Sequence, residues 1–112
     1  MIPTEKERVQ HILKAISYIL EFVDKKDEST FHSDYQLNSA VLFQFLIIGE
    51  AIIYVDNDRL EKYPYPWHLV RGFRNYIAHE YFGINMKLVW QTIIVDLPGL
   101  KSLVEEIHEK EF

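Results

Sequence analysis

One segment of the chain, residues 37–55, is apolar around most of the circumference that a helix would have. Apolar side chains recur along it at helical spacing, at Leu37, Val41, Phe45, Ile48, Ile52 and Val55. Leu42, Leu46 and Ile53 lie off that stripe. A helix of this kind is stable in water only when other elements cover it on several sides. The segment is therefore predicted to be the most buried helix of an all-α fold.

Polar capping patterns mark where the first two helices begin. Thr4-x-x-Glu7 is a capping box, in which each side chain can bind the other residue's backbone N–H. Apolar residues at helical spacing follow it, at Val9, Ile12, Leu13, Ile16, Leu20 and Val23. Residues 24–29 form a polar connection, and a second pattern, Ser33-x-x-Gln36, is expected to open the apolar helix. Asp56-Asn57-Asp58 is expected to end it.

Two prolines and one asparagine place the remaining helices. Pro66 suits the first turn of a third helix, predicted from about Trp67 to Tyr81 and ending near Gly83. Asn85 is a plausible N-cap for a fourth helix, which Pro98 should kink or briefly break. Short connections favour antiparallel neighbours, so we expect an up-and-down four-helix bundle with its fourth helix kinked or broken near Pro98.

The length and composition of the chain limit its class. We expect the 112 residues, 1–112, to form one helical domain, and hydrophobic residues at 48% argue against disorder. The absence of cysteine excludes disulfide scaffolds, cysteine-rich zinc sites and thiol nucleophiles. Uninterrupted apolar runs such as Phe45 to Ile48 are too short to span a bilayer, and no secretory signal is visible. A cytoplasmic protein without membrane contact is expected.

The charge balance is acidic overall but locally basic. The formal net charge is −5, from 17 acidic and 12 basic residues, which alone argues against a high-affinity nucleic-acid binder. Basic residues nevertheless gather between positions 59 and 87, at Arg59, Lys62, Arg71, Arg74 and Lys87. A local basic site for a polyanionic substrate is compatible with this distribution.

The octapeptide from Arg74 to Tyr81 is the most reactive stretch of the chain. It places a permanent cation, a titratable imidazole and a phenol within about two helical turns. The cation can hold a phosphate, and the imidazole of His79 can move a proton near neutral pH. These groups suit phosphodiester chemistry.

Placed on a helix, the octapeptide divides into two sides. The core-facing side is predicted to hold Leu69, Val70, Phe73 and Ile77. The other side holds Arg71, Arg74, Asn75, Ala78 and His79, where the small Ala78 leaves room for a ligand or a partner chain. A solvated face is the ordinary reading of such a pattern. Asn75, which is mildly unfavourable in mid-helix and has no evident packing role, favours a functional face.

The octapeptide and its surroundings resemble a known family. Arg74-x4-His79-x-Tyr81 is similar to the R-x4-6-H signature of HEPN domains, in the R-x4-H-x-Y form of HepT-like toxins from HEPN/MNT toxin–antitoxin modules. Further similar residues stand in the same order along the chain, at Ile48-Gly49-Glu50-Ala51, Pro66-Trp67, Val89-Trp90 and Leu97-Pro98. The resemblance extends from about Ser33 to Ile107.

The resemblance implies a metal-independent endoribonuclease that needs no cofactor. Arg74 would bind the scissile phosphate, and His79 would act as general acid or base when the RNA 2′-hydroxyl attacks the phosphodiester. Asn75 and Arg71 would support them. The products would be a 2′,3′-cyclic phosphate and a 5′-hydroxyl.

The resemblance also implies partners. HEPN toxins typically dimerise so that two motifs face one cleft, so a homodimer is expected. The partner nucleotidyltransferase antitoxin, of the MNT type, can silence such toxins by attaching AMP to the motif tyrosine, here Tyr81. Tyr81 could instead simply pack at the helix end. The alternative function is a non-catalytic HEPN-like dimer that binds a nucleotidyltransferase or a nucleotide.

Other chemistry is less well supported by the residues. Glu105-x-x-His108 is a single Glu-x-x-His pair in a charged tail, and His79-Glu80 lacks the second histidine of a zinc protease motif, so no metal site is expected. Gly49 is expected to permit close contact between helices. Glu50 is expected to form a structural ion pair with Arg71 or Arg74.

Overall fold

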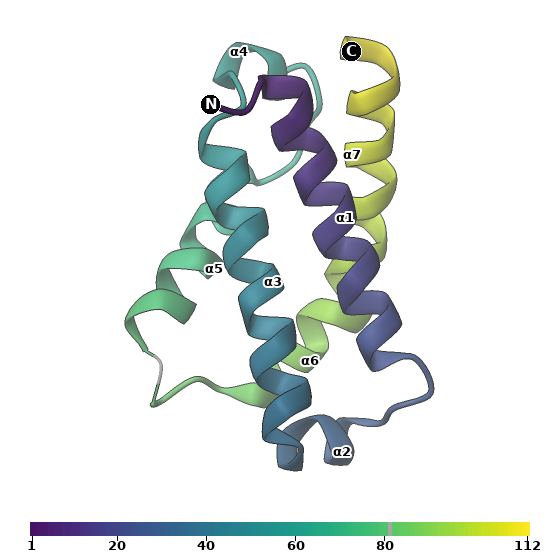
Figure 1. Ribbon diagram of the computed structural model, residues 1–112, viewed down its shortest axis with the longest axis vertical. Helices are drawn as coiled ribbons and strands as arrows, with labels where there is room; N and C mark the ends of the chain where they lie inside the picture. Colours follow the sequence, from purple (N-terminus) through teal and green to yellow (C-terminus); the bar gives the residue numbers. More distant parts are fainter. Residues whose placement is uncertain (81) are drawn as a thin grey trace.

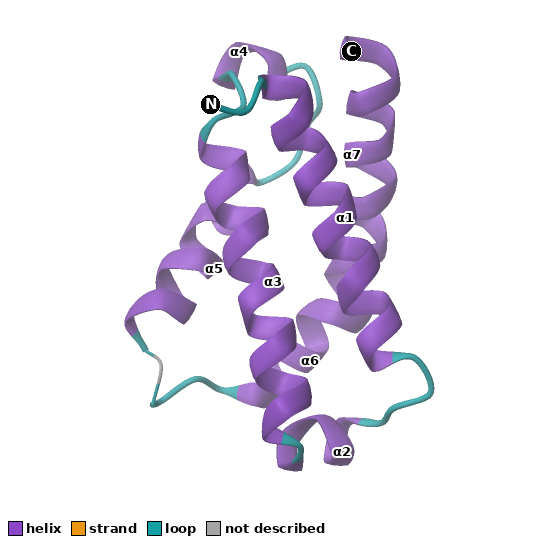
Figure 2. Ribbon diagram, in the orientation of Figure 1, coloured by secondary structure: helices purple, strands orange, loops and turns teal. Residues whose placement is uncertain are grey.

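Helix α3 (Tyr35–Ile53) is the central element of the bundle, with α1 (Glu5–Val23) along one side and α5 (Trp67–His79) along another (Figure 1). A computed structural model describes residues 1–80 and 82–112, and within this part the chain is helical with no strand (Figure 2). The remaining elements are α2 (Glu28–Ser33), α4 (Asn57–Leu60), α6 (Met86–Gln91), the π-helical turn η1 (Thr92–Asp96) and α7 (Leu97–Glu111). The predicted all-α, up-and-down bundle is confirmed.

The stripe predicted for α3 is buried, but the helix is not covered all round. Its inward positions are closed from solvent at Leu37, Val41, Phe45, Ile48 and Ile52. Phe43 and Ile53, in contrast, are 60% and 51% exposed. An apolar side of α3 therefore remains on the surface.

By length and mean hydropathy, α3 could cross a membrane, which a search for uninterrupted apolar runs does not detect. It is the only such helix in the described residues. Its packing between α1 and α5 and its charged Glu50 are typical of the core helix of a soluble protein. The sequence expectation considered only uninterrupted apolar runs. A helix that is apolar on most sides reaches the mean hydropathy of a membrane span without such a run.

The caps confirm one sequence prediction and correct another. Both bonds of the Thr4–Glu7 capping box form, at 3.1 Å and 2.9 Å. Ser33, in contrast, ends α2, and it is Asp34 that caps α3 by accepting a bond from the Leu37 N–H at 3.1 Å. A carboxylate at the positive end of the helix is favoured over a neutral hydroxyl. The polar connection also proved partly helical, since α2 begins within it.

The fourth helix is interrupted next to Pro98, as predicted. Asn85 caps α6 by accepting from the Leu88 N–H at 3.1 Å. The turn η1 then follows, and α7 starts with Pro98 in its first turn, where proline lacks only an N–H that has no helical partner. The chain changes direction between α6 and α7 (Figure 1).

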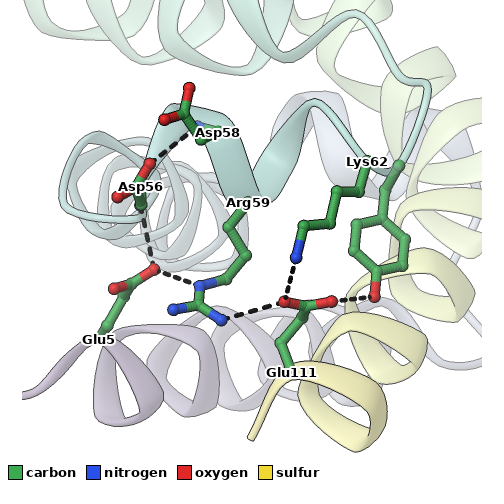
Figure 3. Close-up of polar contacts among 7 residues, drawn as sticks. Glu5, Asp56, Asp58, Arg59, Lys62 and Glu111 are labelled. Carbon is green, nitrogen blue, oxygen red and sulfur yellow. Dashed lines mark hydrogen bonds and ion pairs between the residues drawn. The ribbon is translucent and has the colours of Figure 1, made fainter.

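A polar cluster joins the beginning of α1 to the end of α7, and we call it the terminal network (Glu5, Arg59, Lys62, Tyr63 and Glu111; Figure 3). Arg59 Nε donates to Glu5 at 2.8 Å, and its Nη1 donates to Glu111 at 3.0 Å. Glu111 also accepts from Tyr63 Oη at 2.7 Å and from Lys62 Nζ at 3.2 Å. The segment around α4 thereby connects both ends of the described chain.

Candidate functional site

Arg74 lies where α5 approaches α3 most closely, against Gly49. A Cβ added to Gly49 would overlap the Arg74 Cβ and would lie 2.6 Å from its Cγ. Only glycine therefore fits at position 49 without moving α5 away. This confirms the predicted close helix contact, and it shows that Gly49 seats the base of the Arg74 side chain.

Two neighbours orient the Arg74 guanidinium. Its Nη2 donates to Glu50 at 3.3 Å, and its Nη1 donates to the Asn75 side-chain oxygen at 3.2 Å. The predicted ion pair of Glu50 is thus formed with Arg74. Because the Glu50 and Arg74 side chains are 47% and 32% exposed, the pair contributes little to stability and chiefly directs the guanidinium. Guanidinium carries five N–H donors, so further donors stay available for a phosphate.

Arg71 lies apart from this group. Its Nη2 donates to the Asn57 side chain at 2.8 Å, at the start of α4. Among the predicted site residues, the structure therefore brings together Arg74 and Asn75 and directs Arg71 to a different neighbour. No bond between Arg71 and Arg74 is found in the described residues.

His79 is the last residue of α5, and its side chain is exposed. It follows Arg74 by five residues, which on an α-helix corresponds to about 140° of rotation and about 7.5 Å along the axis. The imidazole and the guanidinium of one chain therefore leave the helix in different directions. The helix ends at His79 rather than near Gly83, and the predicted modification site, Tyr81, lies outside the described residues.

A cleft of about 330 Å³ opens between α1, α3 and α5, next to Arg74. Its polar groups come from Arg8, His11, Glu50 and Arg74. The rest of its lining is apolar and consists of Phe43, Leu46, Ile47, Ala51 and Ala78. Arg8 and His11 were not anticipated, because they stand more than sixty positions before Arg74 and no local motif marks them.

A second hollow, of about 430 Å³, lies on another side of α5, between it, α3 and the α6–α7 segment. Leu69 lines it and is 60% exposed, so its placement in the core was wrong. The reason is that α5 packs chiefly on α3. Ile77 is buried, whereas Val70 and Phe73 are only partly buried and face this hollow.

Within the described residues, no group of three or more histidine, aspartate or glutamate side chains is arranged to hold a metal ion. The groups near Arg74 are instead cations, one carboxylate that is already paired, and an imidazole. Their chemistry is that of anion binding and proton transfer.

The fold and the motif define a class, namely all-helical bundles that carry an R-x4-H motif in the last turns of a bundle helix, here Arg74 to His79. Comparison with protein families is more specific. The family described as "Ribonuclease HepT-like" matches residues 12–107 of the chain. The chain belongs to the HepT-like ribonuclease family.

Individual relatives match over almost their whole length. The chain is 34% identical to "Putative RNase TTE0752" of Caldanaerobacter subterraneus, over 96% of this chain and 97% of the relative. It is 38% identical to "Putative RNase MJ1380" of Methanocaldococcus jannaschii, over 84% and 87%. It is 31% identical to "Probable ribonuclease HepT" of Thermococcus cleftensis, over 95% and 97%. No solved structure matches the chain significantly.

Proposed function

We propose that this chain is an endoribonuclease in which Arg74 and His79 cleave RNA without a metal ion. The observation that carries the proposal is the seating of Arg74. Gly49 admits the base of its side chain and Glu50 and Asn75 direct its guanidinium, in a chain that belongs to the HepT-like family. A cation fixed in this way is preorganised for a phosphate.

The chemistry needs one cation and two proton transfers. The 2′-hydroxyl oxygen attacks the adjacent phosphorus while a base removes its proton. The P–O5′ bond breaks while an acid protonates the leaving 5′-oxygen, which gives a 2′,3′-cyclic phosphate and a 5′-hydroxyl end. Arg74 stabilises the charge on the non-bridging oxygens, and His79 performs one of the proton transfers.

A homodimer would complete this site. Arg74 and His79 of one chain diverge by about 140° around α5, so the guanidinium of one chain is better matched with the imidazole of another. Exposed apolar residues are available for such an interface, including Leu69 at 60% and Ile53 at 51% exposure.

The wider role that we propose is the toxin of a cytoplasmic type II HEPN/MNT toxin–antitoxin module. Its antitoxin would be an MNT-type nucleotidyltransferase that attaches AMP to Tyr81. This tyrosine stands two positions after His79 in sequence, so an added phosphate would compete with RNA for the same cations. Mass spectrometry of the chain co-expressed with its neighbouring nucleotidyltransferase, with Tyr81→Phe as control, tests the modification.

Two observations favour the alternative, a non-catalytic dimer that binds a nucleotidyltransferase or a nucleotide. Arg74 is already paired with Glu50, and the chain is acidic overall with a net charge of −5. A protein of this kind would leave RNA intact while still binding its partner.

Cleavage of a defined RNA in the presence of EDTA separates the two functions. The wild type should yield fragments with 2′,3′-cyclic phosphate ends, and Arg74→Ala and His79→Ala should each remove the activity. His68→Ala is the matched control, because His68 is an exposed histidine of the same helix outside the motif. Cleavage that persists in His79→Ala would refute the mechanism, and an inactive wild type would favour the alternative.

Mixing the two inactive variants tests the shared site. If each site takes Arg74 from one chain and His79 from the other, a mixed dimer of Arg74→Ala and His79→Ala keeps one intact site. Random reassociation should then restore about one quarter of the wild-type activity. No recovery, with mixed dimers present by native mass spectrometry, would place both groups of a site on the same chain.

A further inference from the structure

We propose that the cleft beside Arg74 is a nucleotide-binding subsite for the RNA strand, with Arg8 as its phosphate ligand. The proposal rests on the proposed ribonuclease function and adds to it a binding residue outside the R-x4-H-x-Y motif. It is carried by the state of the Arg8 side chain, by the charge of the cleft and by its apolar floor.

Arg8 is held in place but incompletely bonded. Its guanidinium carbon lies 4.0 Å from the centre of the Tyr54 ring. This contact uses the flat face of the guanidinium and leaves its N–H groups, which lie in the plane, for other partners. The Arg8 Nε atom is buried and, within the described part of the chain, has no hydrogen-bond partner. This unsatisfied donor shows that the fold does not saturate the Arg8 guanidinium, whose outer N–H groups are the ones that a ligand in the cleft would meet.

The cleft is basic although the protein is acidic. Arg8, His11 and Arg74 line it, whereas Glu50 is its one carboxylate and is already paired with Arg74. With two guanidinium groups at one hollow, an anion with several oxygens fits better than a neutral ligand. A phosphodiester strand running past Arg74 would bring a neighbouring phosphate within this hollow.

The floor of the cleft suits a base. Phe43, Leu46 and Ile47 form a patch on α3, and Phe43 is 60% exposed. Stacking on an exposed aromatic ring is the usual way in which proteins bind the bases of single strands without reading their sequence. The volume of about 330 Å³ lies within the range of small-ligand sites. Arg8 can bind a phosphate and Phe43 can stack on a base, so the two side chains together suit one nucleotide unit.

The test measures binding without cleavage. A fluorescent 2′-O-methyl oligonucleotide lacks the nucleophile and cannot be cut, and its affinity is read by anisotropy over a range of salt concentrations. Arg8→Met should weaken binding roughly tenfold and reduce the slope of log affinity against log salt by about one. Arg8→Lys should retain the slope and lose part of the affinity. Phe43→Ala should weaken binding several-fold with the slope unchanged.

Lys6→Met is the matched control, since Lys6 is an exposed cation of the same helix outside the cleft lining. It should change neither affinity nor slope beyond a small general effect. Equal losses in Arg8→Met and Lys6→Met would overturn the subsite, because they would show only a diffuse charge effect. Circular dichroism and thermal melting establish whether each variant is folded. If Arg8→Met does not fold, the affinity of Arg8→Lys is used to test the subsite instead.

The design keeps the subsite separate from catalysis. If the wild type cleaves no RNA but Arg8→Met still weakens oligonucleotide binding, the subsite stands and the enzymatic function falls. If the wild type cleaves RNA and Arg8→Met binds the oligonucleotide as tightly as the wild type, the subsite is refuted and the enzymatic function stands. If Arg8→Met converts a dimer into a monomer with unchanged affinity per chain, the cleft is a contact between copies and the proposal is wrong.

Discussion

Arg59 and Arg74 both bridge helices in this protein, and their surroundings differ. Arg59 pairs with two glutamates, Glu5 at 2.8 Å and Glu111 at 3.0 Å, and its guanidinium lies 4.7 Å from the Phe112 ring. Arg74 pairs with a single exposed glutamate at 3.3 Å. The guanidinium of Arg59 is bound by groups within the fold, whereas the guanidinium of Arg74 keeps N–H donors for a ligand.

The contrast shows how the same residue type serves structure or function. A guanidinium surrounded by carboxylates gains its interactions when the chain folds and has little left to offer a substrate. A guanidinium held by one weak pair is oriented but not saturated. The number of anionic partners, rather than the presence of an arginine, separates the two regions.

The largest expected effect comes from making the same conservative change at both arginines. Arg74→Lys should lower the rate of RNA cleavage about 10²-fold or more, because an ammonium cannot replace the forked guanidinium on a phosphate. Arg59→Lys should leave the cleavage rate near that of the wild type and lower the thermal midpoint. Cleavage assays and melting curves on both variants measure this. Equal rate losses would abolish the distinction.

The next effect concerns the seat of Arg74. Gly49→Ala should destabilise the protein by about 1–3 kcal/mol, because the added Cβ overlaps the Arg74 side chain and forces α5 away from α3. It should lower RNA cleavage as well. Urea denaturation gives the first quantity. Gly72→Ala is the control within α5, because its Cβ meets nothing within 4 Å, and it should stabilise the helix by up to about 1 kcal/mol.

A smaller effect is expected when the terminal network is titrated with acid. The hydrogen bond from Tyr63, followed by the bond and charge of Lys62 and Arg59, lowers the pKa of Glu111 from its usual 4.5. The stabilisation is therefore present above about pH 4.5 and is lost as the pH falls through the lowered pKa. Glu111→Gln should be less stable than the wild type at neutral pH, and the difference should shrink in acid. Denaturation midpoints between pH 7 and pH 2 measure it, and a constant difference would contradict the assignment.

The smallest effect on stability is expected at alkaline pH. The bond to Glu111 is the main reason that the pKa of Tyr63 rises from 10.0 to about 12. Because the pKa is raised on folding, the stabilisation is complete below pH 10 and is lost as the pH rises towards 12. Ultraviolet titration should show a tyrosine that ionises with a pKa of about 12, and this step should be missing in Tyr63→Phe. A Tyr63→Phe titration identical to that of the wild type would disprove the assignment.

The helices were predictable because their signals are local. Capping at Thr4 and Asn85 and the spacing of apolar residues on α1 and α3 depend on residues a few positions apart. The same locality explains the error at Ser33, because the next residue, Asp34, can cap a helix equally well, and its carboxylate is the group that accepts from the Leu37 N–H.

The candidate site could be predicted only in part, because its members come from three helices. The motif and Glu50 were found from sequence, and the Glu50–Arg74 pair formed as expected. Arg8 and His11 join the site only through the packing of α1 on α3, which no local motif indicates. The exposure of Leu69 likewise depends on which sides of α5 the other helices cover. Whether Arg74 and His79 act together depends on a second chain, and that remains a prediction.

The terminal network also bears on protein engineering. Glu5 and Glu111 bind one guanidinium, so the two ends of the described chain lie side by side (Figures 1 and 3). A short glycine-rich linker could join them, and new ends could be opened in the exposed turn at Lys25, whose φ of 60° already departs from the helical range. A circular permutant of this kind would keep α3 and α5 on one uninterrupted stretch of chain and would return α1, with its side of the cleft, through the linker.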